Sequence, residues 1–285
     1  MAGSTWSLSS DFSLIHNPSS VWSYGSKPAG FQTTGMFSLF TTLALAPNGT
    51  GIVAWFPGGN SFGDSWLGVY YNPNPTEAIL DLDGNGKTIP AKSVCMHPSE
   101  VFSFSVVRFT APTNGYYSLD VTFTHIDVKA IDRHTGVYIV YNNLMVLWET
   151  DLIGIGDSNS FKSVDSGVAV KANETIDFIV GSGLDGLFLN DMTLANVDIR
   201  LLVATSTTGI LPTNTNPTNE ILSTNTDSTN GNLIPIIIGS FGASLSLVIA
   251  VILIYVYYRH RKNKEYQQRN PVTSRTDNEI ITSGS

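Results

Sequence analysis

Aromatic, amide and carboxylate side chains gather in the segment AWFPGGNSFGDSWLGVYYNPNP, residues 54–75 of the 285-residue chain. Sugar rings present flat C–H faces that pack on aromatic rings, while amides and carboxylates bind their hydroxyl groups. Glycines in the 56–65 loop also allow a ligand to approach the backbone closely. The segment therefore predicts a glycan-binding site, lined by Trp55, Asn60, Asp64, Trp66, Tyr71 and Asn72.

Tryptophans that flank strands are more often core residues, so this alternative stays open for Trp55 and Trp66. We expect Trp22 and Trp148 to be core residues. The two alternatives differ in what replacement does, because losing a core indole unfolds a domain whereas losing a surface indole weakens binding.

Catalytic chemistry has little support in the residue pattern. The histidines of the first 200 residues are scattered, and their default roles are structural. A carboxylate pair for glycoside hydrolysis must face across a cleft at a set separation, which a sequence does not show. We therefore predict a protein that is not an enzyme, with no catalytic residues and no cofactor. The histidines are His16, His97, His125 and His134.

The segment DLDGNG, residues 81–86, resembles the first half of a calcium-binding loop, with Asp81, Asp83 and Asn85 at alternate positions. Such loops end on a bidentate Glu at position twelve, where this chain has Lys92. Asp-Gly and Asn-Gly pairs are themselves turn signals. The pattern therefore favours a β-turn, and no metal site is predicted.

Most of the chain before residue 205 shows the alternation typical of β-strands. In residues 115–128, four apolar side chains alternate with polar ones, which places the apolar residues on one face. Glycine and proline turn signals separate this run from similar ones. Many short strands with such punctuation predict an all-β domain, residues 1–204, with a jelly-roll or β-sandwich fold. The four apolar residues are Tyr117, Leu119, Val121 and Phe123.

Cys95 is the single cysteine of the chain, so an internal disulfide is ruled out. A domain of about 200 residues can bury enough apolar surface to fold without one. We expect Cys95 to be a buried thiol.

An apolar run from Leu233 to Tyr258 contains no charged residue. About 20 apolar residues suffice to cross a bilayer, so residues 233–258 are predicted to form one transmembrane helix. Gly239 and Ala243 form a small-xxx-small pair in this run, which would let two helices pack as a homodimer. Small residues without a partner are the alternative.

Basic residues follow this run, at Arg259, Arg261, Lys262 and Lys264, whereas residues 205–232 contain no Lys or Arg. Short basic flanks stay in the cytoplasm. Residues 259–285 are therefore predicted to be a disordered cytoplasmic tail and the domain to face outward from the plasma membrane. The Thr, Asn, Ser and Pro of residues 205–232 predict a disordered stalk.

An exported domain needs a basic, apolar leader, and residues 1–25 do not contain one. We therefore expect a truncated N-terminus, with a cytosolic domain as the alternative. Asn48 and Asn173 begin N-glycosylation sequons, as expected for an outward-facing domain. Residues 1–232 contain nine Lys or Arg against twenty Asp or Glu, a balance of −11, which argues against a nucleic-acid partner.

Several motifs occur in an order that resembles a known module. They are WSLSSDFSLIHNPSSVWSYG, CMHPSE, SVVRFTAPTNGYYSLDVTF, GVYIVYNNLMVLW, ETIDFIVGSG and NDMTL, within residues 6–203. This pattern resembles a β-sandwich module of secreted and surface proteins, similar to carbohydrate-binding modules. The resemblance implies a jelly roll and no catalytic residues. With its stalk, helix and basic tail, the chain resembles a fungal-style single-pass surface protein.

Two functions from different classes follow from these patterns. The first is a single-pass cell-surface protein whose outer domain binds a glycan or cell-wall polysaccharide. The alternative is a non-catalytic structural or adhesive surface protein that has no specific sugar ligand. Sugar-competed, saturable binding would distinguish them.

Overall fold

The computed structural model describes residues 3–59, 62, 66–81, 84, 86–99, 103–127, 134–184 and 186–204. The chain divides into two units, Met1–Leu211 and Pro212–Ser285, and the described residues belong to the first. In these ranges there is no helix of the length and apolarity that crossing a bilayer requires. The predicted stalk, transmembrane helix with its Gly239 and Ala243 pair, and tail lie outside the described residues.

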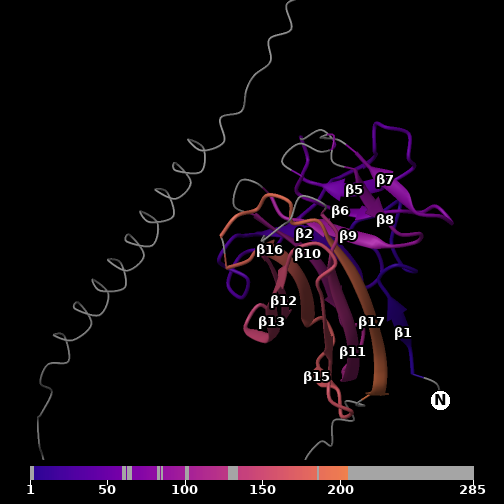
Figure 1. Ribbon diagram of the computed structural model, residues 1–285. Coiled ribbons are helices and arrows are strands. Elements are labelled where there is room, and N and C mark those ends of the chain that lie inside the picture. Colours follow the sequence, from indigo (N-terminus) through magenta and orange to yellow (C-terminus); the bar gives the residue numbers. More distant parts are fainter. Residues whose placement is uncertain are drawn as a thin grey trace, which may run out of the picture. The chain divides into compact units, whose positions relative to one another are not determined.

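Two antiparallel sheets form the domain, and Figure 1 shows them as two layers, with β11 and β17 in one and β12 and β13 in the other. The larger sheet has the order β14-β11-β17-β9-β6-β5-β4, with β1 beside β17 and β15 beside β11. Its strands are β1 (Thr5–Ser7), β4 (Thr42–Leu45), β5 (Val53–Phe56), β6 (Gly68–Tyr71), β9 (Val94–His97), β11 (Gly115–His125), β14 (Ser158–Lys162), β15 (Val168–Val170) and β17 (Thr193–Ala204).

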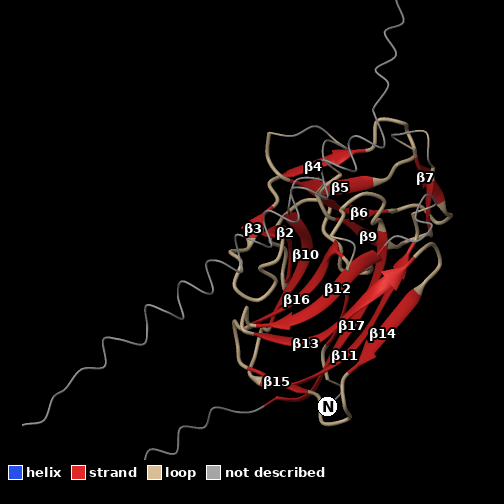
Figure 2. Ribbon diagram, turned by 60° about the vertical axis from the view of Figure 1, so that its left-hand side comes forward, coloured by secondary structure: helices blue, strands red, loops and turns tan. Residues whose placement is uncertain are grey.

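The smaller sheet has the order β13-β12-β16-β10-β2-β3 (Figure 2). Its strands are β2 (Trp22–Pro28), β3 (Ser38–Leu39), β10 (Ser103–Thr110), β12 (His134–Tyr141), β13 (Met145–Ile153) and β16 (Thr175–Ser182). β7 (Ala78–Leu80) pairs with β8 (Lys87–Ile89) as a separate hairpin. Leu82, Asp83 and Asn85 of the DLDGNG segment between them lie outside the described residues, so its turn stays a prediction.

The main core lies between the two sheets. The four alternating apolar residues of β11 are buried, and they pack with inward residues of the smaller sheet such as Ile139 and Phe178. Each large apolar side chain removed from water contributes roughly 1.5–3 kcal/mol. The predicted all-β domain with two packed sheets is therefore confirmed for the described residues.

Other predicted core residues are also in place. Trp22 is fully buried and meets Phe109 edge-on, with ring centroids 5.4 Å apart. Trp148 is partly buried and stacks on Phe123 at 6.3 Å. Cys95 is a buried free thiol, and burial raises the pKa of this thiol. A thiol held protonated in this way is inert, which agrees with a packing role.

Candidate functional site

The structure places two of the predicted aromatic site residues in the core. Trp55 is 5% exposed, and its indole N–H donates a hydrogen bond to the carbonyl of Ser13 at 2.8 Å. Tyr71 is 8% exposed and stacks on Phe12, with ring centroids 4.7 Å apart. Strands β5 and β6 are buried along their whole length, because apolar clusters cover both of their faces. Both rings therefore stabilise the fold instead of presenting a surface to a ligand.

Asn72 is fully buried and also serves the fold. Its side-chain N–H groups donate to the carbonyls of Thr76, Ile89 and Pro90, at 2.9–3.0 Å. Its side-chain oxygen accepts a hydrogen bond from the backbone N–H of Asn74. Because its donors and acceptor are all engaged in the connection after β6, Asn72 is a turn residue and not a surface ligand group.

Asn60 and Asp64 lie outside the described residues, while Trp66 is described and partly buried. The backbone of Trp66 has a φ of 55°, a left-handed conformation that few side chains adopt. The Lys87 ammonium lies 4.4 Å from the centroid of the indole ring, and the His97 ring lies 5.7 Å away. The ring is therefore held by buried polar neighbours, and a role for Trp66 in ligand binding stays a prediction.

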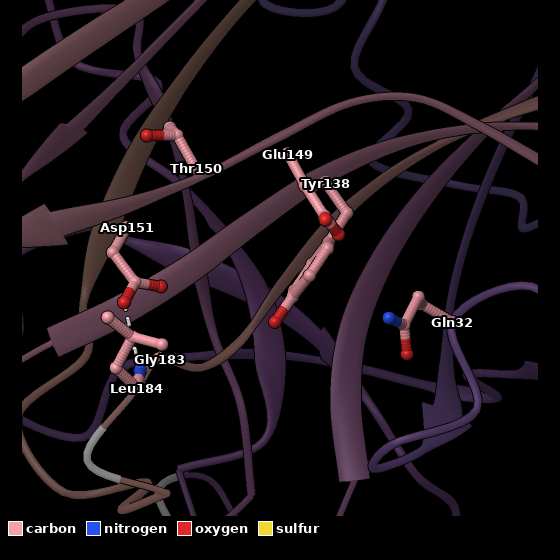
Figure 3. A pocket seen from close by; sticks show the side chains of 7 residues that line it. All are labelled: Gln32, Tyr138, Glu149, Thr150, Asp151, Gly183 and Leu184. Carbon is pink, nitrogen blue, oxygen red and sulfur yellow. Dashed lines mark hydrogen bonds between the residues drawn. The ribbon is translucent and has the colours of Figure 1, made fainter.

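A cavity of about 390 Å³ opens on the outer face of the smaller sheet, next to its edge strand β13. Residues of β12, β13 and two loops converge on it (Figure 3). They are Gln32, Tyr138, Glu149, Thr150, Asp151, Gly183 and Leu184. Apart from Gly183 and Leu184, these residues supply amide, hydroxyl, carboxylate and aromatic groups, which bind the hydroxyls and apolar faces of sugars in proteins.

Two glycines explain why the sheet is hollowed here. Gly136 of β12 lies directly opposite Gly181 of β16. A Cβ at Gly181 would lie 2.1 Å from the Phe104 ring, and one at Gly136 would lie 2.5 Å from the Tyr138 hydroxyl oxygen. Both rings therefore lie in space that side chains would otherwise fill. The Gly136–Gly181 pair is the floor over which the two aromatic rings can lie.

Tyr138 is the aromatic group of the cavity. Its ring stacks on Phe104, with centroids 5.8 Å apart and an interplanar angle of 26°. Its hydroxyl donates a long hydrogen bond, 3.3 Å, to the carbonyl of Ser182. Figure 3 shows the phenol standing between Gln32 on one side and Asp151 on the other. The ring is thus fixed in orientation and flanked by polar groups.

Two carboxylates line the same wall, because Glu149 and Asp151 are two residues apart on β13 and so point to one face. The Glu149 carboxylate is exposed, and it makes no hydrogen bond or ion pair with another described residue. Asp151 accepts a hydrogen bond of 2.9 Å from the backbone N–H of Leu184 and lies 3.4 Å from Nδ1 of His134. These contacts leave acceptor capacity on both carboxylates for a ligand.

A buried ion cluster anchors the loop that carries Gln32. Asp177 binds the Lys27 ammonium at 2.6 Å and the Arg108 guanidinium at 2.6 and 2.9 Å. Lys27 also donates to the backbone carbonyl of Gln32 at 2.7 Å, and Arg108 lies over the ring of Phe37 in the same loop. Burial lowers the pKa of Lys27, while the charge of Asp177 opposes that effect. The cluster therefore fixes the loop above the sheet.

A second cavity, of about 470 Å³, lies on the outer face of the larger sheet, between β1, β11, β14 and β17. Its aromatic lining residue is Trp6, whose ring packs against Phe109 at 5.4 Å in the core. Its charged residues include Asp120 and Lys162, an exposed pair 3.0 Å apart. This cavity is a solvated, charged surface and offers a sugar less aromatic area than the cavity at Tyr138.

Sequence reasoning missed the cavity at Tyr138. The one signal for it was glycine inside strands, at Gly136 and Gly181, because an isolated glycine in a strand often marks a close approach of another group. Which aromatic ring occupies the space depends on cross-strand register, which the sequence pattern does not contain.

Comparison with known proteins gives no family assignment, since no protein-family model and no curated protein matches the chain. Structural neighbours include CBM51 from Clostridium perfringens GH95, solved in complex with methyl-galactose, at 15% identity and a TM-score of 0.28. That likeness covers 41% of this chain and 74% of the module. At this TM-score the likeness carries no argument about function.

Two further neighbours are equally distant. One is the CBM51-2 and INT domains of Clostridium perfringens ZmpB, with CBM51-2 in complex with GlcNAc, at 15% identity and a TM-score of 0.32 over 61% of this chain and 43% of that one. The other is the enzymatically active domain of bacteriophage CBA120 tailspike protein 4, at 12% identity and a TM-score of 0.28 over 64% of this chain and 20% of that one.

Proposed function

We propose that this chain is a non-catalytic, glycan-binding surface protein whose cavity at Tyr138 holds a sugar ring. One observation carries the proposal: a single cavity brings together the Tyr138 ring, the Glu149 and Asp151 carboxylates and the Gln32 amide. This combination supports recognition of a sugar because the ring accepts its apolar C–H face and the polar groups accept or donate hydrogen bonds to its hydroxyls.

The expected affinity is modest. The cavity is open to solvent, and its single aromatic lining residue, Tyr138, covers one sugar ring. A flexible polysaccharide also loses conformational freedom when it binds. We therefore expect dissociation constants on the order of 10 μM to 1 mM for an oligosaccharide. Several domains displayed on one surface would raise the avidity without any new contact.

A direct test is a binding screen of wall and extracellular glycans, followed by titration of each binder with paired tyrosine variants. Tyr138→Ala should weaken binding by about tenfold or more, the loss expected when a stacking ring is removed. Tyr116→Ala is the matched control, because Tyr116 is an exposed tyrosine on the larger sheet. Loss of binding in the Tyr116 variant alone would place the site on the other sheet.

Trp66 supplies a second candidate site for the same function, because it is the tryptophan of residues 54–75 whose indole is neither fully buried nor fully exposed. Trp66→Ala should weaken glycan binding if this candidate is right. Unfolding of the variant would instead show that the indole packs over Lys87 as part of the fold.

We also propose that the domain is displayed on the outside of the plasma membrane. The apolar run 233–258 with its basic flank supports this orientation. Both predicted glycosylation residues support it too, since Asn48 lies exposed in the turn after β4 and Asn173 lies exposed in the turn before β16. Expression behind a signal peptide should give a chain whose mass falls on enzymatic deglycosylation. An unmodified chain would favour the cytosolic orientation.

A structural or adhesive protein without a sugar ligand is the competing function. It predicts no saturable glycan binding by the folded domain at millimolar sugar concentration. A complete screen with that result would replace the glycan-binding proposal.

A further inference from the structure

The charges around the cavity restrict which glycan it takes. We propose that the cavity at Tyr138 selects amino sugars that carry a protonated amine over neutral sugars, and that it rejects acidic sugars. This inference rests on the proposed function, because it names the ligand class of the same site. It follows from three features: the carboxylates in the wall, the engagement of Lys27 and Arg108 by Asp177, and the charge balance of residues 1–232.

The wall of the cavity carries negative charge without a basic partner among its lining residues. Glu149 and Asp151 supply two carboxylates, and none of the seven lining residues is Lys or Arg. Glu149 has no ion-pair partner among the described residues, and Asp151 is engaged by a backbone N–H and by His134. An ammonium group donates three hydrogen bonds and accepts none, so it complements a wall of acceptors.

Two basic side chains that the structure describes on this sheet face are engaged elsewhere. Lys27 and Arg108 both bind Asp177, and the Lys27 ammonium is fully buried beneath the loop that carries Gln32. Arg108 also donates a hydrogen bond of 2.9 Å from Nη2 to the side-chain oxygen of Asn143. Among the described residues, a uronate or sialate entering the cavity would therefore face two carboxylates without a Lys or Arg in the lining to bind it.

Long-range charge acts in the same direction. Residues 1–232 carry a balance of −11, which attracts polycations and repels polyanions at low ionic strength. Within the described residues, no group of three or more His, Cys, Asp or Glu side chains is placed to hold a metal ion. The two carboxylates of β13 therefore suit a single organic cation better than a bound metal.

The test compares four probes of equal length on the full-length chain: oligomers of glucosamine, N-acetylglucosamine, galacturonate and lysine. Glucosamine carries an ammonium group where N-acetylglucosamine carries a larger, neutral acetamide, so the part of their affinity ratio that charge-neutral variants of the wall remove reports the contribution of the charge. We expect glucosamine to bind about tenfold tighter or more, as a charge-assisted hydrogen bond allows. Galacturonate should not bind measurably.

Charge-neutral variants then locate the effect. Glu149→Gln and Asp151→Asn should each reduce the glucosamine preference, and the double variant should bring the ratio close to one while N-acetylglucosamine binding persists. Asp120→Asn is the matched control, because Asp120 is an exposed carboxylate on the larger sheet. It should leave the ratio unchanged, since it lies on the other sheet.

The outcomes separate this inference from the proposed function. Equal binding of the two sugar oligomers, lost in Tyr138→Ala, would overturn the amine preference and leave the glycan site standing. If lysine oligomers bind as tightly as glucosamine oligomers and Tyr138→Ala does not weaken that binding, the effect is general charge attraction and the inference is overturned. Absence of binding by every sugar would overturn both proposals.

Discussion

The outer faces of the two sheets differ in what covers them. On the smaller sheet, Phe104, Val106, Val140, Ile179 and Phe188 form an apolar cluster that the loops after β2 and β16 help to cover. On the larger sheet, an apolar cluster with the β7–β8 hairpin covers the outer face of β5, β6 and β9, whereas the outer face of β11, β14 and β17 is open to water. Its hydroxyl groups pair across strands, as between Thr122 and Ser160 at 2.8 Å, and its charges pair in the open.

This difference between the two faces indicates where a rigid polar site can form. A covered face lowers the local dielectric, so an ion pair or a polar cavity placed there is held rigidly and its charges act strongly. An open face lets water screen each charge, and exposed ion pairs contribute little. The Asp177 cluster is buried on the covered face of the smaller sheet, and the cavity at Tyr138 opens on the same face.

The largest expected effect comes from the buried ion cluster. Asp177→Ala leaves the Lys27 and Arg108 charges buried without a carboxylate, which should lower the free energy of unfolding by about 3–5 kcal/mol. Urea unfolding monitored by tryptophan fluorescence would measure the change. A loss below about 1 kcal/mol would show that the cluster is solvated like a surface pair, and the comparison between the two faces would fail.

A smaller loss of stability is expected when a side chain is added at the Gly136–Gly181 pair. The Cβ of Gly181→Val would meet the Phe104 ring, so overpacking should cost about 1–3 kcal/mol. Displacing Phe104 and Tyr138 should also abolish sugar binding. Ser160→Val on the open face is the control, and it should change stability by less than about 0.5 kcal/mol. Normal binding by the Gly181 variant would show that the floor does not shape the cavity.

A pH effect is expected at His125, whose Nε2–H donates to the carbonyl of Asn190 at 2.7 Å in the loop after β16. Burial lowers the pKa of His125 below 6.5, although Asp127 and Asp157 oppose this shift. As the pH falls below 6.5, the unfolded chain binds a proton that the folded chain does not, so stability falls. Unfolding curves from pH 7.5 to 5 should show a shallower decline for His125→Gln. Parallel declines in the stability of the two proteins would show that His125 does not cause the pH dependence.

The smallest effect is expected on the open face. Asp120→Ala removes an ion pair whose two side chains are 56% and 74% exposed, so the free energy of unfolding should change by less than about 0.5 kcal/mol. The same urea unfolding assay applies. A loss approaching that of Asp177→Ala would mean that exposure does not decide what a charge pair contributes here.

Much of the fold was predictable because apolar and polar residues alternate wherever a strand has one buried face and one exposed face. Strand β11 is such a strand, and its inward residues were correctly assigned. Strands β5 and β6 lack that contrast, because clusters pack against both of their faces. A site hypothesis based on Trp55 or Tyr71 therefore had no pattern in the sequence to correct it.

The site itself was less predictable, for a geometric reason. The cavity requires Gly136 to lie opposite Gly181, more than forty positions later in the chain. Phe104 must then reach the same space from a third strand. Such register relations arise from tertiary pairing and leave no local periodicity. Asn72 shows the same limit, since an amide suited to a sugar hydroxyl is equally suited to three backbone carbonyls.

The most direct test of the central claim is an NMR titration of the isotope-labelled domain with a binding oligosaccharide. The claim that the covered face holds the sugar predicts saturable shifts of backbone amide signals at Glu149, Asp151, Gly183 and Leu184, while Asp120 and Arg200 of the open face stay unchanged. Saturable shifts confined to the open face, or no shifts at millimolar sugar, would contradict it.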